Sequence, residues 1–134
     1  MDDFTASWKL LPQLNMGAVI EFTFCGVHHW AHGPKIMRYI EDVLARKSAA
    51  ALIINFDGYR YEFGNDLFGV FVTAGFEKVA KRIRPVCVVA HGQTEVALKS
   101  LLSASNTAYI FDITFANTPA QLDEWLHHRA VPSA

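Results

Sequence analysis

The sequence predicts a single α/β domain in which a mixed, mostly parallel sheet carries an N-terminal hairpin and about four helices. Two almost unbroken apolar runs, residues 50–56 and 86–91, are typical of central strands that are covered on both faces. Helical patterns follow each run, and repeated strand–helix–strand units imply right-handed crossovers between parallel strands. The chain has 134 residues, the usual length of one domain, and no linker or repeat, so we expect residues 1–134 to fold as one unit.

Composition and charge exclude several classes of protein. Hydrophobic residues make up 51% and charged residues 19%, so the chain can build a packed core and is not of the disordered class. The formal net charge is -1 and Lys and Arg form no run, so we expect no nucleic-acid partner. The longest apolar stretches are under about 10 residues, too short for an integral membrane segment. The N-terminal residues do not form a secretory signal. Cys25 and Cys87 lie in apolar runs, which predicts two buried thiols in a cytoplasmic protein.

Four elements are predicted in the first half of the chain. Pro12 places the first strand at an edge of the sheet, because a central strand would need the backbone N–H that proline lacks. The next strand alternates apolar and polar side chains with period two and can pair with the first as a hairpin. An apolar stripe at helical spacing then follows Pro34, a favoured first residue of a helix. In order, these elements are strands over residues 8–14 and 18–27, a helix from Pro34, and a strand over 50–56.

The second half contains three predicted helices and two strands. The first of these helices is apolar nearly all round at its start, and Pro85 stops it. Thr94 can cap the second, while Thr118 and Gln121 form a capping box before the third. In order, the elements are a helix over residues 66–84, a strand over 86–91, a helix near Thr94, a strand over 108–113 and a helix from Pro119.

The segment from residue 58 to 68, here called the joint, is the most elaborate connection between a strand and a helix. It begins with the letters GYRYEFGND. Gly58 permits a turn of the backbone that a side chain would forbid. Asn65 or Asp66 can cap the following helix, and free backbone N–H groups beside Gly64 would suit an anion. Function gathers at such places in open α/β sheets, although a capped turn without a further role explains the same residues.

The joint also carries a resemblance to a known family. The order of elements, and the stretch LIINFDGYRYEFGNDLFGVFV in particular, resembles the STAS domain of bacterial anti-sigma factor antagonists and of sulfate transporter tails. The family has Asp-Leu-Ser-Gly after the strand and Asp-Ser-Ser-Gly-Leu at the start of the helix. This chain reads Asn-Phe-Asp-Gly at 55–58 and Phe-Gly-Asn-Asp-Leu at 63–67. The resemblance implies a STAS-like fold and a signalling role through protein–protein interaction.

One departure from the family bears directly on mechanism. In STAS antagonists a partner kinase phosphorylates the serine at the start of the helix, and this breaks the complex. The matched position here is Gly64, and no Ser, Thr or phosphorylatable His lies between Gly58 and Val72. The serine switch therefore cannot operate at this position. Glu62 or Asp66 could supply a fixed negative charge instead, with less charge and a different shape from phosphate.

The leading hypothesis is a non-enzymatic regulatory or binding module that engages a protein partner, a kinase or another regulator, through the joint. Its aromatic side chains would anchor the partner, since such side chains are frequent in interface cores. We expect no cofactor, no metal and no catalytic residue, and the same surface could pair two copies of the chain. The predicted contact residues are Tyr59, Tyr61, Phe63, Gly64, Asn65, Asp66 and Phe68.

Two alternatives of other classes remain open from the sequence. One is a small-molecule or lipid carrier with an apolar pocket lined by Phe68, Phe71 and Phe76. The other is an enzyme that uses a metal held by the histidines of the HHWAH segment, residues 28–32, although these are more readily explained as surface histidines of a loop. No nucleophile elbow, P-loop or dinucleotide-binding motif is present.

Overall fold

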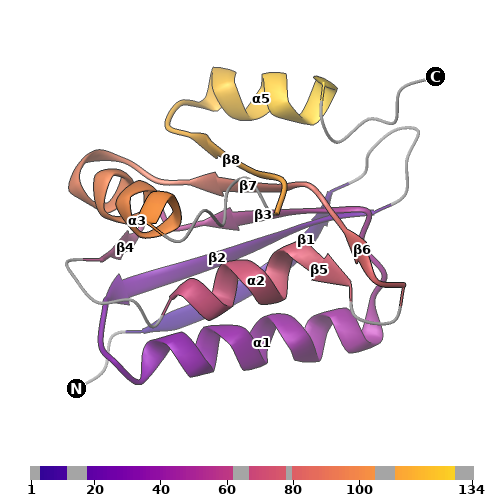
Figure 1. The fold of residues 1–134 in the computed structure, drawn as a ribbon, viewed down its shortest axis with the longest axis horizontal. Helices are drawn as coiled ribbons and strands as arrows, with labels where there is room; N and C mark the ends of the chain where they lie inside the picture. The colour runs from indigo at the N-terminus through magenta and orange to yellow at the C-terminus, as the bar shows by residue number, and fades with distance from the viewer. Residues whose placement is uncertain (1–3, 12–17, 62–66, 78–79, 105–110, 129–134) are drawn as a thin grey trace.

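In the computed structural model of the chain, a mixed sheet lies between helices on both of its faces (Figure 1). α1 and α2 lie side by side on one face, and α5 lies on the other. The strand order of the sheet is β1-β2-β3-β7-β8. The structure describes residues 4–11, 18–61, 67–77, 80–104 and 111–128.

The sheet confirms the predicted hairpin and the mostly parallel arrangement. β1 and β2 pair antiparallel, and every other neighbouring pair in this sheet is parallel. The first strand lies at the edge, as expected, but it begins three residues earlier than predicted; residues 12–17 lie outside the described ranges. The strands are β1 (Thr5–Leu11), β2 (Val19–Val27), β3 (Ala51–Asn55), β4 (Tyr59–Arg60), β7 (Val86–Val89) and β8 (Ile113–Ala116).

The helices confirm the predicted alternation with the strands. The capping box forms at the start of the last helix, where the Gln121 N–H donates to Thr118 Oγ1 at 3.1 Å. Gln121 Oε1 in turn accepts the Asn117 N–H at 2.8 Å. No helix within the described residues is both long and apolar enough to span a bilayer. The helices are α1 (His32–Arg46), α2 (Phe68–Gly75), α3 (Gly92–Ala104) and α5 (Pro119–His128).

The second helix is shorter than predicted. The expectation of a helix over residues 66–84 is wrong, because α2 ends at Gly75 and a small hairpin of β5 (Phe76–Glu77) and β6 (Arg82–Ile83) follows. Phe111 packs so tightly against Gly75 that a Cβ there would lie 3.3 Å from the phenylalanine side chain. Tertiary packing at a residue with poor helix propensity therefore overrides the helical pattern of the sequence.

The last strand also lies later in the chain than predicted. We expected residues 108–113, whereas β8 spans Ile113–Ala116 and residues 105–110 lie outside the described ranges. The buried side chains of β8 are Ile113 in the larger cluster and Ala116 in the smaller one, and Ile113 pairs in register with Val86 of β7. Thr114 and Phe115 between them are only half-buried, so β8 lacks the unbroken apolar run that identified β3 and β7 in the sequence.

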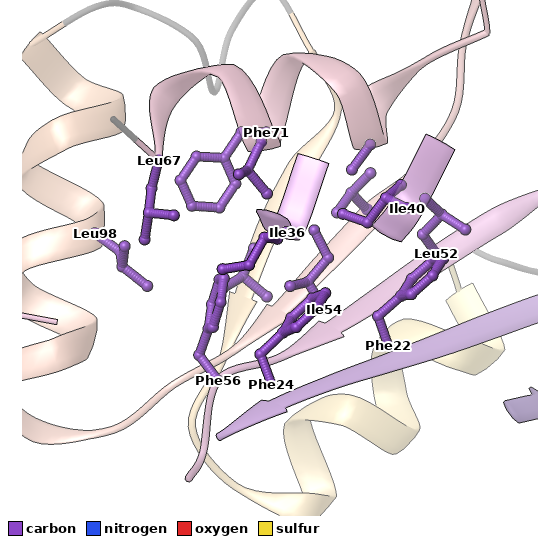
Figure 2. Close-up of a cluster of buried hydrophobic side chains, with 14 of the residues drawn as sticks. Phe22, Phe24, Ile36, Ile40, Leu52, Ile54, Phe56, Leu67, Phe71 and Leu98 are labelled. Carbon is purple, nitrogen blue, oxygen red and sulfur yellow. The ribbon is translucent and has the colours of Figure 1, made fainter. Parts of the chain in front are cut away.

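The core consists of two apolar clusters, one on each face of the sheet. On β3, alternate side chains separate the clusters: Leu52 and Ile54 belong to the larger one, and Ile53 to the smaller. The smaller cluster packs β3 and β7 against Trp125 of α5. Figure 2 shows part of the larger cluster, whose labelled, fully buried side chains are Phe22, Phe24, Ile36, Ile40, Leu52, Ile54, Phe56, Leu67, Phe71 and Leu98.

The two cysteines differ in environment. Cys87 is fully buried in β7, and this burial raises the pKa of its thiol to about 12, so the thiol stays protonated at neutral pH. Cys25, near the end of β2, is only half-buried, which corrects the expectation of two buried thiols. Both are free thiols.

Candidate functional site

The joint begins as a short continuation of the sheet. The Gly26 N–H donates to the Gly58 carbonyl at 3.0 Å, and the His28 N–H donates to the Arg60 carbonyl at 2.8 Å. These bonds hold β4 parallel to the end of β2. The Tyr59 N–H donates back to the Phe56 carbonyl at 2.9 Å, which closes the turn after β3. The first part of the joint is therefore fixed by backbone hydrogen bonds.

Gly58 is required by a close contact. A Cβ at this position would lie 2.7 Å from Cys25 Sγ, well inside van der Waals distance. The sequence predicted that a side chain would be excluded here; the structure assigns the exclusion to the neighbouring strand. Gly58 is not among the described residues with a positive φ, so backbone conformation is not the reason.

We expect Gly58→Ala to lower the free energy of unfolding by about 1–3 kcal/mol, the usual cost of overpacking. In a Cys25→Ala background, which removes the sulfur, most of that cost should disappear. Urea denaturation of the wild type, the two single variants and the double variant gives the coupling energy. Strictly additive effects would show that Cys25 is not the obstacle.

Polar side chains fasten the turn after β3 to its neighbours. Asn55 Oδ1 accepts the Asp57 N–H at 2.8 Å, and Asn55 Nδ2 donates to Glu21 Oε2 at 3.2 Å. Asp57 Oδ1 lies 3.1 Å from Nδ1 of His91, which begins the connection after β7. The turn is therefore tied to two neighbouring strands of the sheet.

Thr94 of α3 holds the joint from the other side. Its hydroxyl donates to the Tyr59 carbonyl at 3.3 Å and accepts the Tyr61 N–H at 3.4 Å. The sequence predicted Thr94 as a helix cap, but α3 begins two residues earlier, at Gly92. Thr94 thus serves as a link between α3 and the joint.

Two histidines converge on the hydroxyl of Tyr59. His28 Nδ1 lies 2.6 Å from Tyr59 Oη, and His32 Nδ1 lies 3.2 Å from the same oxygen. A hydroxyl donates one hydrogen bond and can accept two, so at most one of the two Nδ1 atoms accepts from Tyr59 and the other must donate to it. The His32 side chain also stacks on Phe4, with ring centroids 4.6 Å apart. This cluster ties the connection between β2 and α1 to the joint.

The cluster corrects the expectation of a loop of surface histidines. His32 is only 2% exposed and is the first residue of α1, whereas His29 is exposed. The ring nitrogens of His28 and His32 that face inward meet a tyrosine hydroxyl. Within the described ranges, no three His, Cys, Asp or Glu side chains are grouped as ligands for a metal ion. The arrangement offers no support to the metal-enzyme alternative.

The architecture has a counterpart among solved structures. The crystal structure of an anti-sigma factor antagonist from Mycobacterium paratuberculosis aligns with 88% of this chain and 93% of its own, with a TM-score of 0.56. The fold is that of an anti-sigma factor antagonist. The two sequences are 19% identical, and the likeness therefore concerns the fold. No protein-family model and no curated protein matches the sequence.

β4, the described start of the joint, lies at the carboxyl edge of the parallel strands, on the side of the fold where α1, α2 and α3 begin (Figure 1). Gly64, the position matched to the family's serine, lies outside the described residues. Tyr59 and Tyr61 carry the hydroxyls between Gly58 and Val72 and are each 2% exposed. In this structure a kinase could not reach either hydroxyl without local unfolding.

The structure changes the roles expected of Tyr59, Tyr61 and the capping residues of the joint. The rings of Tyr59 and Tyr61 belong to the larger core cluster, which corrects their expected role as surface anchors: they position the joint from inside. Phe68 is half-buried at the start of α2. Leu67, rather than Asn65 or Asp66, occupies the N-cap position, and it makes no side-chain capping bond. Phe63, Gly64, Asn65 and Asp66 lie outside the described residues, so their contact role stays a prediction.

Sequence reasoning missed an exposed aromatic residue beside the joint. Trp30 is 74% exposed, and it lies two residues beyond His28, whose backbone bonds to Arg60 of β4. Val27, at the end of β2, is also more than half exposed. A tryptophan in the polar HHWAH segment was the available signal, but the interpretation of this segment considered only its histidines, as surface residues of a loop or as metal ligands.

The carrier alternative gains no support from its three phenylalanines. Phe71 is fully buried in the larger cluster, where its ring meets Phe56 edge-on at 6.4 Å. Phe68 begins α2, whereas Phe76 follows its last residue and begins β5. Phe76 borders a cavity, but neither Phe68 nor Phe71 lines it.

Proposed function

We propose that the chain is a non-enzymatic regulatory module that binds a protein partner, a kinase or another regulator, through the joint and the start of α2. The anti-sigma factor antagonist fold supports this class of function. We place the protein in the cytoplasm, as befits a regulator of that kind. A homodimer formed through the same surface is one outcome of the experiment below.

The exposed Trp30 side chain carries the proposal. Burying a large aromatic side chain in a partner's pocket removes much apolar surface from water, and tryptophan is enriched among residues that dominate binding energy. The loop that bears it is fastened at both ends, by the His28 backbone bond to β4 and by His32 at the start of α1. Binding would therefore require little ordering of this loop.

Regulation by serine phosphorylation is not part of the proposal, because the joint has no serine. The exposed side chain of Asp57 and the side chains of Glu62 and Asp66 are acidic without any modification. A partner with a basic surface would meet these charges without a modification step. Control of the complex would then come from the partner or from another site on this chain.

We expect Trp30→Ala and Gly64→Arg each to weaken partner binding at least about tenfold, which corresponds to roughly 1.4 kcal/mol. The first removes the anchor, and the second adds a bulky charged side chain at the position matched to the family's serine. Tagged wild type and variants, expressed in the native host and captured, would be compared by quantitative mass spectrometry of what accompanies them.

Ile83→Ala is the matched control, because Ile83 is an exposed apolar residue on β6, away from the joint. All variants should melt within a few degrees of the wild type. A partner retained by both Trp30→Ala and Gly64→Arg would place the interface elsewhere. If the captured protein is a second copy of the chain, two differently tagged copies should co-elute and the same variants should separate them.

A further inference from the structure

A second candidate site lies at the far end of α2 from the joint. A cavity of about 330 Å³ is bounded by the C-terminal half of α1, the end of α2 and the β5–β6 hairpin. Its size falls at the small end of the range for ligand pockets. Part of its wall is apolar and consists of Leu44, Ala45, Ala49 and Phe76. Arg84 also lines it, and we call it the Arg84 cavity.

Arg84 is a buried arginine. Arg84 is only 6% exposed. Its backbone N–H donates to the Gly75 carbonyl at 2.9 Å, which fixes Arg84 beside the end of α2. Within the described ranges, its buried Nε has no hydrogen-bond acceptor, and its guanidinium forms no ion pair. Burial lowers the pKa of Arg84, and nearby Glu77 only partly opposes this effect.

The neighbouring acid is already engaged. Glu77 pairs with Arg82 across the β5–β6 hairpin, where Arg82 Nη2 lies 3.0 Å from Glu77 Oε2. Arg82 and Glu77 are directly opposite in the register of the two strands. The carboxylate of Glu77 is therefore paired with Arg82, and among the described residues no other carboxylate is bonded to Arg84.

An arginine in this position needs an anion. A guanidinium does not lose its proton under ordinary conditions, so burial cannot be accommodated by neutralisation. A charge taken out of water without a partner is unfavourable, and a bound anion would compensate it. The planar donor fork of arginine matches carboxylate and phosphate groups.

We propose that the Arg84 cavity binds a small organic monocarboxylate, with its carboxylate on the Arg84 guanidinium and its apolar part against Leu44 and Phe76. Glu41 and Glu77 line the same cavity together with Lys47, so with Arg84 its charged side chains balance and do not favour a dianion such as phosphate. The apolar wall favours an organic group over a bare inorganic ion. This site stands independently of the partner proposed for the joint.

Titration of the full chain with benzoate tests the proposal. Benzoate should cause saturable NMR shifts of the Ala45, Ala49 and Thr73 amides, with a Kd on the order of 1 mM, as expected for so small a ligand. Benzyl alcohol, which keeps the ring and lacks the charge, should bind at least about tenfold more weakly, and so should inorganic phosphate. Absence of saturation with benzoate, or equal binding of either comparison compound, would overturn the proposal.

Variants of Arg84 separate a ligand-binding role from a structural one. Arg84→Met keeps a side chain of similar length and removes its charge. It should abolish the NMR shifts caused by benzoate and leave the melting temperature unchanged or higher. Arg84→Lys keeps the charge without the fork and should weaken binding. Arg38→Met is the control, because Arg38 is exposed on α1 and does not line the cavity. Benzoate binding that survives Arg84→Met, or lower melting temperatures of both Arg84 variants, would contradict the assigned role.

Discussion

Replacement of Phe56 by alanine should lower the free energy of unfolding by about 3–5 kcal/mol, the range seen when a buried phenylalanine is truncated. Phe56 is fully buried directly after β3, where the sheet turns into the joint. Its ring centroid lies 5.8 Å from that of Phe24, 5.3 Å from that of Tyr59 and 6.4 Å from that of Phe71. A cavity here would remove contacts with β2, the joint and α2 at once, and close packing lets little of it collapse.

Guanidinium denaturation, monitored by circular dichroism, would measure this loss. Phe115→Ala is a suitable comparison, because Phe115 is half-buried at the margin of the same cluster. It should cost less than half as much as Phe56→Ala. Similar losses for both variants would show that Phe56 does not occupy the centre of the packing between sheet, joint and α2.

Replacement of Tyr59 should have the second largest effect, in two stages. Tyr59→Phe keeps the ring and removes the hydroxyl that meets His28 and His32, so it should cost about 1–3 kcal/mol for the groups left unpaired. Tyr59→Ala removes the buried ring as well and should cost about 3–5 kcal/mol. Denaturation of both variants gives the two values.

Tyr59→Phe also distinguishes a residue that positions the joint from one that contacts the partner directly. Tyr59→Phe leaves the outer surface of the joint unchanged, and partner binding should therefore fall far less than in Trp30→Ala. Hydrogen exchange of residues 28–32 should quicken, because their tie to Tyr59 is lost. A Tyr59→Phe protein as stable as the wild type, with unchanged exchange in this loop, would show that the cluster does not hold the joint.

The sequence was sufficient for the architecture because the strongest patterns in it are those of buried elements. Apolar runs identify β3 and β7, and the Pro34 and Thr118 signals place α1 and α5 within two residues. The predicted boundaries of an element were wrong where a tertiary contact determines its end. Gly75 ends α2 against Phe111, a residue distant in the chain, and no local pattern reveals that contact.

The joint as candidate site is a prediction from the sequence, and the sequence did not reveal which of its residues are buried. Tyr59 and Tyr61 alternate with Arg60 and Glu62, a pattern that fits a surface ladder and a buried face equally well. Only the fold shows that the tyrosines point inward. Arg84 could not be recognised either, because Pro85 made it look like the polar end of a helix.

Hydrogen exchange of the protein with its captured partner tests the central claim most directly. We expect slower exchange in the complex at residues 28–31, at the backbone of the joint and at the start of α2, and little change at α5. The same experiment with Trp30→Ala should show much less protection at equal concentrations. Protection confined to α5 or to the outer edge of β1 would contradict a binding module that acts through the joint.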